Sequence, residues 1–225
     1  GLMPTYLNAG VIPEVVETLK QLYGIKVAGK IYLNNLLTLY SLLYHDKNIP
    51  LLKEQQYHTS TGEIYKKIQI YYDLISNKDP KLLEDAYYQV KFLLKNACDF
   101  FEKNKELPYT LIRKKTFPSF ILQKMVWTIR DKHSYPGILY SRHSRTGLGN
   151  QIESCMNIFG EDIMTGNIEI TDTEYFKRDE IKEIYPAVYH FSPLLEELEK
   201  FEKSPVTIEF AAESYENTHL FAVLQ

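Results

Sequence analysis

Apolar residues recur at helical spacing through most of the first 130 residues. Pro13 stands at the first position of a predicted helix, and Gly24 supplies its C-terminal stop. The apolar stripe of this helix consists of Val15, Val16, Leu19 and Leu22. The next predicted helix, Lys30–His45, is so rich in apolar residues that we expect it to be central in the helical part.

Two further helices have clear start signals. Ser60 followed by Glu63 predicts a capping box, in which each side chain satisfies a backbone N–H of the other residue. Asp79-Pro80 opens the next helix, which runs to about Lys105. Its predicted buried stripe consists of Leu83, Ala86, Val90, Leu94, Ala97 and Phe101.

A last helix of this region is predicted at Pro118–Asp131, around the only tryptophan, Trp127. No strand longer than three residues is expected between positions 12 and 131. After Pro136 the pattern changes to short mixed elements. Strands are predicted at Gly137–His143, Asn167–Thr171, Pro205–Glu213 and His219–Gln225, helices at Gln151–Phe159, Thr173–Ile184 and Ser192–Lys203, and a glycine-rich turn at Thr146–Asn150.

The order of these elements predicts an α+β protein. A helical N-terminal region, residues 1–135, is expected to pack on a smaller mixed region, residues 136–225, with an antiparallel sheet. The last two strands read as an antiparallel hairpin whose tip, Ser214–Thr218, is longer than two residues. In the last helix Ser192 is the expected cap and Pro193 the first helical residue.

Composition excludes several classes of protein. With 44% apolar and 24% charged residues among 225, the chain is expected to fold. Its 26 basic and 29 acidic residues give no net attraction for nucleic acid or an anionic membrane. No apolar run reaches the roughly 18 residues of a membrane span, and no signal peptide is visible. The six histidines are scattered, so neither a metal nor another cofactor is expected.

Two segments together suggest cysteine chemistry. Gly147–Met156 reads as a glycine turn that leads into a helix containing Cys155. Near the C-terminus, His219 opens an apolar strand. A helix N-terminus favours a thiolate, and an imidazole accepts its proton, so this layout suits a cysteine nucleophile with a histidine base.

These residues resemble the papain-like cysteine proteases of bacterial toxins and effectors. In that branch a Gly-Asn-Cys-x-Glu run opens the nucleophile helix, and the base histidine begins a later strand. The matching residues here are Gly149, Asn150 and Glu153 in the first run and Asn217, His219, Phe221, Val223 and Leu224 in the second. The resemblance implies a papain-like unit over about the last 75 to 90 residues, with His219 as base and a backbone N–H near Gln151 at the oxyanion.

The sequence departs from this family at two points. The nucleophile position is occupied by Gln151, and the strand that would carry the third catalytic residue would lie beyond Gln225. Three explanations stay open: a catalytically inactive relative, a cysteine replaced by engineering, or a nucleophile displaced to Cys155. The last requires Gln151 and Cys155 to lie one turn apart on one helix face. Alternatively, Cys155 is an inert core residue among apolar neighbours, as is expected of Cys98.

The resemblance also implies a protein substrate or a host-protein partner, and delivery into a host cytoplasm by a specialised secretion system. Arg142, His143, Arg145, Asn150 and Glu153 are then the candidate substrate-binding residues. The run from Arg142 to Arg145 is also similar to the phosphate-binding run of histidine phosphatases, although only 80 residues follow it.

Two other function classes remain open from the sequence. The Gly147–Gln151 turn matches the sugar-nucleotide turn of fucosyltransferases, and His58 before Thr59 and Ser60 resembles a strand-end histidine of ADP-ribosyltransferases. A glycosyl- or ADP-ribosyltransferase is therefore one alternative. The other is a non-enzymatic domain that binds a host protein through its helical half.

Overall fold

The computed structural model describes residues 4–46, 59–104, 118–164, 171–176, 181–216 and 218–224. The chain divides into two compact units, residues 1–125 and 126–225. This border lies ten residues before the one expected from the sequence. His58 and the greater part of the predicted strand Asn167–Thr171 lie outside the described residues.

The first unit is built around its second helix. Helices α1 (Pro13–Tyr23) and α2 (Ile25–Tyr44) are joined by Gly24. Gly24 has φ +82° and ψ 162°, a conformation that favours glycine, and its N–H donates to the Lys20 carbonyl. Every residue of α2 from position 28 to 39 is buried. The predicted central apolar helix is thereby confirmed.

Helix α4 (Thr61–Lys78) begins with the predicted capping box. The Ser60 N–H donates to Glu63 Oε2 at 3.0 Å, and the Glu63 N–H donates to Ser60 Oγ at 3.4 Å. These reciprocal bonds satisfy two backbone donors that a helix start leaves without partners. Two hydrogen bonds from Ser60 lower the pKa of the Glu63 carboxyl. The bond from the Ser60 hydroxyl has the larger effect and the bond from its backbone N–H the smaller.

The helix predicted from Asp79 to Lys105 is two helices, α5 (Lys81–Glu84) and α6 (Ala86–Asn104). Asp85 lies between them in extended conformation, and its carboxylate accepts from the Tyr88 N–H at 3.0 Å, as an N-cap does. The break rotates the buried face of α6. Gln89, Leu93, Ala97 and Phe101 are buried, whereas Leu94 is 42% exposed. The prediction was therefore wrong for Leu94 and right for Ala97 and Phe101.

A buried polar network holds the N-terminal segment against α2 and α6. Gln89 accepts hydrogen bonds from the Gly10 N–H and the Asn35 side chain, and donates to the Leu82 carbonyl at 2.9 Å. Asn35 also donates to the Asn8 carbonyl at 2.8 Å. Gln89 and Asn35 are fully buried, so these bonds replace water for groups that would otherwise be costly to bury.

The prediction of a helix at Pro118–Asp131 was wrong, because the structure has no helix there. Ile121 and Leu122 are 93% and 86% exposed. Because these apolar side chains are not packed against other elements, burial does not stabilise a helix here. Farther along, Thr128 donates to the Ile158 carbonyl and Ile129 is buried. These tertiary contacts fix a turn where the sequence pattern predicted helix.

The second unit contains a five-stranded antiparallel sheet with the order β3-β2-β1-β4-β5. The strands are β1 (Tyr135–Tyr140), β2 (Asn150–Ser154), β3 (Thr171–Phe176), β4 (Thr207–Tyr215) and β5 (Thr218–Val223). A short helix, α8 (Gly160–Met164), and a long one, α9 (Pro186–Glu202), complete the unit. Together with the helical first unit, this confirms the predicted α+β class with an antiparallel sheet.

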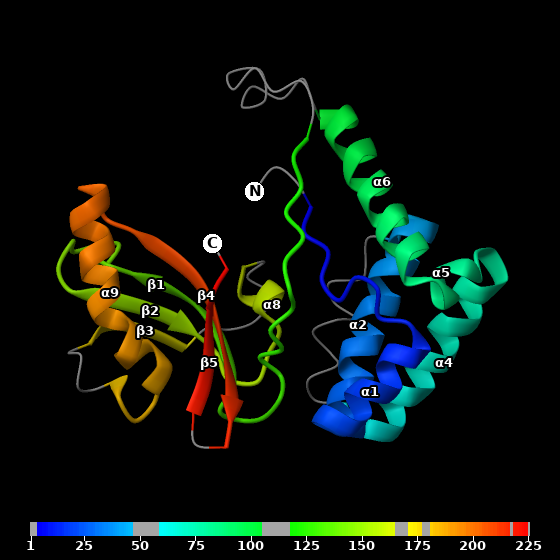
Figure 1. Cartoon of the computed structure of the whole chain (residues 1–225), viewed down its shortest axis with the longest axis horizontal. Coiled ribbons are helices and arrows are strands. Elements are labelled where there is room, and N and C mark those ends of the chain that lie inside the picture. The colour runs from blue at the N-terminus through cyan, green and yellow to red at the C-terminus, as the bar shows by residue number, and fades with distance from the viewer. Residues whose placement is uncertain are drawn as a thin grey trace. The chain divides into compact units, whose positions relative to one another are not determined.

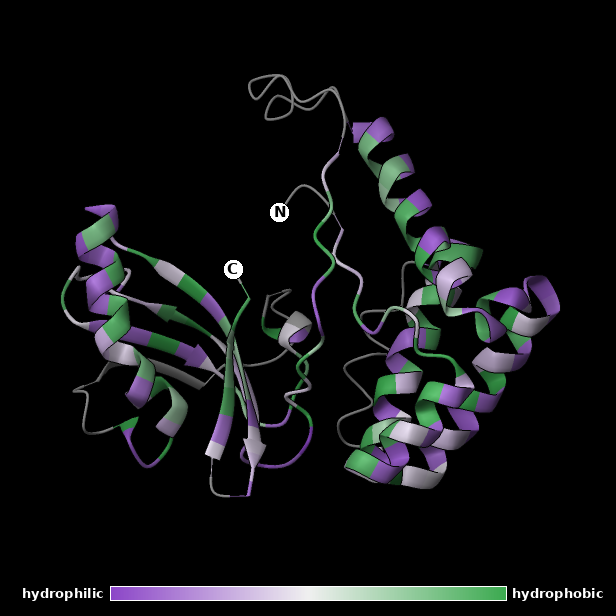
Figure 2. Cartoon of the chain, in the orientation of Figure 1, coloured by the Kyte–Doolittle hydropathy of each residue, from purple (hydrophilic) through white to green (hydrophobic). Residues whose placement is uncertain are grey.

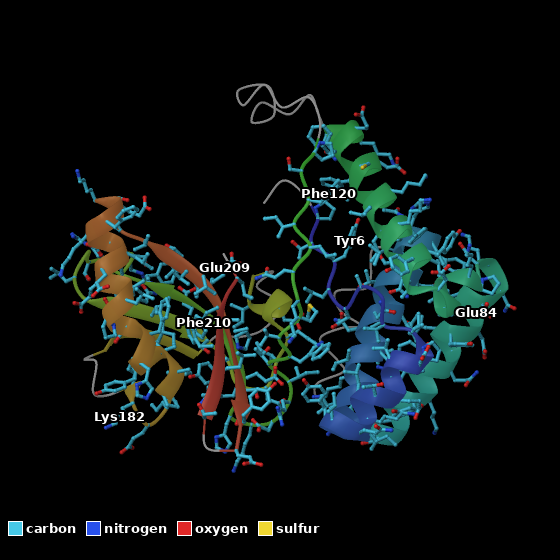
Figure 3. The ribbon with its side chains drawn as sticks, viewed as in Figure 1. Tyr6, Glu84, Phe120, Lys182, Glu209 and Phe210 are labelled. Atoms are coloured by element: carbon cyan, nitrogen blue, oxygen red, sulfur yellow. The ribbon has the colours of Figure 1, made fainter. Side chains whose placement is uncertain are left out.

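Helix α9 covers one face of the sheet (Figure 1). Directly paired residues share a face, so the register places Tyr135, Leu139, Ile152, Phe210 and Phe221 on the side of α9. Glu209 and Phe210, labelled in Figure 3, are consecutive on β4 and therefore belong to opposite faces. Phe210 is 1% exposed, as the α9 side requires.

One position of the central strand admits only glycine. A Cβ added at Gly137 would lie 2.7 Å from the Glu153 carbonyl oxygen and 2.7 Å from the Phe210 ring. Both distances are shorter than carbon atoms tolerate, and one of the obstacles is backbone. Gly137 therefore allows β2 and the Phe210 ring to approach β1 closely.

Pro193 lies inside α9 rather than at its start, so the prediction of a helix beginning at Ser192 was wrong. Proline lacks the N–H that would bond to the carbonyl four residues earlier, which is that of Tyr189. The Ser192 hydroxyl donates to this carbonyl at 3.0 Å instead. Packing of Val188 and Ala187 in the core extends the helix N-terminally to Pro186.

Two other elements differ from the predictions. Most of the described part of Thr173–Ile184 is not helix: its first residues belong to β3, and a single turn covers Ile181–Ile184. The hairpin of β4 and β5 is confirmed, but its tip is two residues, because Tyr215 and Thr218 form the last pair. Glu216, in this tip, has a positive φ of 39°, as tight hairpin turns require.

Candidate functional site

The predicted nucleophile segment is a strand. The prediction of a helix at Gln151–Phe159 was wrong, because residues Asn150–Ser154 form β2 and pair with both β1 and β3. The glycine turn before it is confirmed, with positive φ at Gly147 and Gly149. Pairing on both sides outweighs the local helix pattern, and residue 151 has no helix N-terminus to stabilise a thiolate.

Gln151 and His219 are not neighbours. Gln151 pairs with Tyr140, whose side chain is on the face away from α9, whereas His219 pairs with Ser214 on the α9 face. β1 and β4 separate their strands, so three strand spacings, roughly 14 Å, lie between them. The resemblance implied that His219 lies within reach of residue 151 or residue 155, and for residue 151 this expectation was wrong. A nucleophile and its base need hydrogen-bond reach, which this placement does not give.

Cys155 follows directly after β2 and is separated from β5 by the same two strands. Its thiol is half-buried, and burial raises its pKa, an effect that the contact with the Met156 carbonyl only partly opposes. A raised pKa leaves little thiolate at neutral pH, and the thiolate is the nucleophile. The geometry therefore supports the reading of Cys155 as an unreactive thiol.

His219 itself has structural partners. One ring nitrogen, Nε2, lies 3.1 Å from the His133 carbonyl oxygen, and the ring packs against Tyr135 with centroids 5.8 Å apart. Burial raises the pKa of the Tyr135 phenol. Its hydroxyl oxygen accepts from the Ala187 N–H. These contacts link β5 to β1 and to the start of α9.

Glu153 and Gln151 form a polar cluster with the β1–β2 loop. The Gln151 side chain donates to Glu153 Oε1 at 3.1 Å and accepts from the N–H and the hydroxyl of Ser144. Tyr140 donates to Glu153 Oε2 at 3.1 Å. Gln151 is only 3% exposed. Its carboxamide therefore fixes the loop instead of facing a substrate.

The other predicted substrate-binding residues lie in the same loop. His143 is buried, and its Nδ1 accepts hydrogen bonds from the N–H groups of Arg145 and Thr146. Arg142 binds Glu199 of α9 through Nε at 2.6 Å and Nη2 at 2.5 Å. This contact raises the pKa of Arg142 and lowers that of Glu199. The Arg142 side chain therefore connects the β1–β2 loop to α9.

A hollow of about 410 Å³ adjoins this ion pair. It is lined by Arg142, Glu199, Lys200, Lys203, Ser204 and Pro205. Asn150, at the start of β2, and the exposed Arg145 are not among these residues. The structure thus does not bring the five predicted binding residues together around one cavity.

The most distinctive surface of the second unit is the outer edge of β5. The Leu224 N–H donates to the Glu209 carbonyl at 2.8 Å, and Val223 pairs with Phe210. Antiparallel pairs alternate between bonded and non-bonded positions, so residues 218, 220, 222 and 224 point their backbone groups toward β4. The N–H and C=O groups of His219, Phe221 and Val223 point outward, where the described part of the sheet has no further strand.

Exposed apolar side chains lie along this edge. Leu220 is 43% exposed, Val223 48% and Leu224 36%. Figure 2 shows hydrophobic colouring over the C-terminal half of β5. No charged residue occurs between positions 218 and 224, whereas the opposite edge strand, β3, contains Asp172 and Glu174. The hairpin was predictable from the sequence, but its place at the edge depends on the strand order.

No group of three His, Cys, Asp or Glu side chains is placed to hold a metal ion within the described residues. Among the helices that the structure describes, none combines the length and hydropathy needed to cross a membrane. Comparison of the sequence with protein-family models and with curated proteins found no match.

Proposed function

We propose that this chain is a protein-binding module that takes up an extended segment of a partner along the outer edge of β5. The observation that supports this most directly is the row of outward-facing backbone groups at His219, Phe221 and Val223 on an uncharged strand. The sequence suggested that a partner binds the helical half, whereas this binding surface is an edge of the sheet in the second unit. Such strand addition is a common mode of peptide recognition.

Thiol hydrolysis is the weaker proposal for this site. It needs a thiolate, a base within about 3 Å, and oxyanion donors near the nucleophile. Gln151 and His219 lie on opposite faces of the sheet, and burial disfavours the thiolate of Cys155. Strand addition requires none of these groups, since it uses the main chain.

The edge also defines the preferred partner chemistry. Backbone groups at three alternate positions supply hydrogen bonds to an extended segment, and side chains on the two faces of β5 supply selectivity. Val223 flanks the edge on the α9 side, and Leu220 and Leu224 flank it on the other. A partner segment with apolar side chains on both faces and no charge fits this surface.

The experiment uses an edge proline. Val223→Pro removes one outward N–H and no bond to β4, because proline is tolerated where the N–H of an edge strand faces solvent. Val223→Thr keeps the N–H and the β-branched shape and is the matched control. The probe is a fluorescein-labelled octapeptide with valine at its four central positions, and therefore on both faces, and threonine at its ends. Its anisotropy reports binding to the full chain.

We expect the parent chain and Val223→Thr to bind the peptide, and Val223→Pro to bind it at least tenfold more weakly while its circular dichroism is unchanged. Equal binding by all three proteins would place the peptide elsewhere and overturn the proposal. Absence of binding to the parent chain, together with a Phe221 amide that exchanges rapidly with and without peptide, would overturn it as well.

A further inference from the structure

We infer that the segment that β5 takes up is β5 of a second copy of this chain, paired antiparallel about a two-fold axis at Phe221. This inference rests on the proposed strand addition and names its partner. It needs no additional surface, because the two interacting edges are identical.

The outward backbone groups have the symmetry that this pairing needs. They belong to His219, Phe221 and Val223, which are spaced evenly about Phe221. In an antiparallel pair centred there, Phe221 faces Phe221 of the second copy, and His219 faces its Val223. Each facing pair exchanges two N–H···O bonds, so about six main-chain hydrogen bonds form without any change in the existing ladder to β4.

The absence of like charges on β5 favours its pairing with a second copy. Two copies of β5 bring no like charges together, because residues 218–224 carry none. Edge strands are commonly protected from self-pairing by charged residues. β5 has no such protection between residues 218 and 224.

The side chains on the α9 face are arranged for the contact. Phe221 stacks on Phe210 with ring centroids 5.0 Å apart and on Phe191 of α9 at 4.6 Å. These two rings hold the Phe221 ring before any partner binds, so little side-chain entropy is lost on pairing. Paired phenylalanines across an antiparallel ladder add to its stability.

The opposite face gains apolar burial. There Leu220 faces Ala222 of the second copy, and Leu224 faces its Thr218, as the same register requires. The exposed fractions of Leu220 and Leu224 fall when the two ladders join. The two-fold axis is perpendicular to the sheet, so both α9 helices lie on one side of a continuous ten-stranded sheet whose outer strands are both β3.

Sedimentation velocity and amide hydrogen exchange on the full chain test this inference. In the monomer the Phe221 and Val223 amides face solvent, whereas the Leu220 and Ala222 amides bond to β4. We expect a dimer whose population rises with protein concentration, and protection at Phe221 and Val223 that rises in parallel. Protection at Leu220 and Ala222 should stay constant and serves as the internal reference.

Val223→Pro should sediment as a monomer with an exposed Phe221 amide, while Val223→Thr should remain dimeric. A parent chain that is monomeric at all concentrations, with a rapidly exchanging Phe221 amide, would overturn the inference. A dimer that persists in Val223→Pro would also overturn it, since that dimer uses another surface. A monomer that still binds the valine–threonine octapeptide would contradict self-pairing and leave the proposed strand addition standing.

Discussion

Gln151 and His219 project from opposite faces of one antiparallel sheet, and β1 and β4 lie between their strands. His219 matched one run of a papain-like protease and Gln151 occupied the nucleophile position of the other, so the resemblance required the two residues to meet. The helix expected at Gln151 would have brought them together at one end of a layered α/β unit. The second strand of a hairpin, which occupies that position instead, keeps them apart.

The placement of Cys155 predicts a slowly reacting thiol. In a Cys98→Ser background, we expect iodoacetamide to alkylate Cys155 at pH 7.5 several-fold more slowly than free cysteine. Burial raises the pKa of Cys155, so the rate should rise with pH until well above the ordinary thiol range. Mass spectrometry of the intact protein measures both rates.

The matched variant for this prediction is His219→Ala in the same background. Because the two residues lie on strands separated by β1 and β4, the alanine should leave the alkylation rate of Cys155 unchanged. Fast alkylation that disappears in His219→Ala would show a catalytic pair and would restore the protease reading.

Gly137→Ala should destabilise the second unit by about 2–3 kcal/mol, because the new Cβ collides with the Glu153 backbone and the Phe210 ring. Urea unfolding followed by the fluorescence of Trp127, the only tryptophan, reports on this unit. The control is Gly62→Ala in α4, where nothing lies within 4 Å. There alanine, in the first turn of the helix, should leave the first unit unchanged or stabilise it by up to about 0.5 kcal/mol, measured by circular dichroism during the same unfolding. Loss of stability in both variants would contradict the steric argument.

The polar network under the N-terminal segment predicts a large effect at one glutamine. Gln89→Ala leaves the Gly10 N–H, the Asn35 amide and the Leu82 carbonyl without this partner. We expect a loss of about 2–4 kcal/mol in the free energy of unfolding, measured by urea titration with circular dichroism. Gln69→Ala, at an exposed position of α4, should change it by less than about 0.5 kcal/mol. Equal effects at the two glutamines would contradict the network.

The capping box predicts a pH dependence in the first unit. Hydrogen bonds from Ser60 lower the pKa of Glu63 in the folded chain, so Glu63 stabilises the fold above its unfolded pKa. This contribution should disappear as the pH falls through the lower, folded pKa. Thermal unfolding between pH 6 and pH 2.5 measures it. Glu63→Gln retains a cap acceptor but cannot titrate, so its stability should fall less steeply with acid; an identical slope would contradict the assignment.

Local chemistry was sufficient to predict much of the first unit. The proline and glycine limits of α1 and the capping box of α4 each depend on a few neighbouring residues, and all were found. The rotated face of α6 was missed because it depends on Asp85, whose carboxylate caps a new helix where the periodicity seemed continuous. One side-chain hydrogen bond therefore changed which leucine is buried.

The candidate site was less predictable, since it depends on long-range pairing. Residues 150–154 carry a helical pattern, yet β1 and β3 bind them on both sides and hold them extended. The same limit applies to β5: its sequence indicates a strand, but only the order β3-β2-β1-β4-β5 shows that its outer backbone groups lack a partner among the described strands. Neither fact is encoded within a short window of sequence.

The proline inside α9 has a consequence for the order of folding. Ser192-Pro193 carries the signals of a helix start, so we expect the segment from Pro193 to Glu202 to favour helix locally before it packs on the sheet. The preceding turns, from Pro186, contain Ala187 and Val188, which are buried in the core, so we expect their helical conformation to depend on packing against the strands. In the folded helix the Ser192 hydroxyl binds the Tyr189 carbonyl that Pro193 leaves without a backbone donor, so a residue suited to cap a helix start keeps two helix-forming segments continuous.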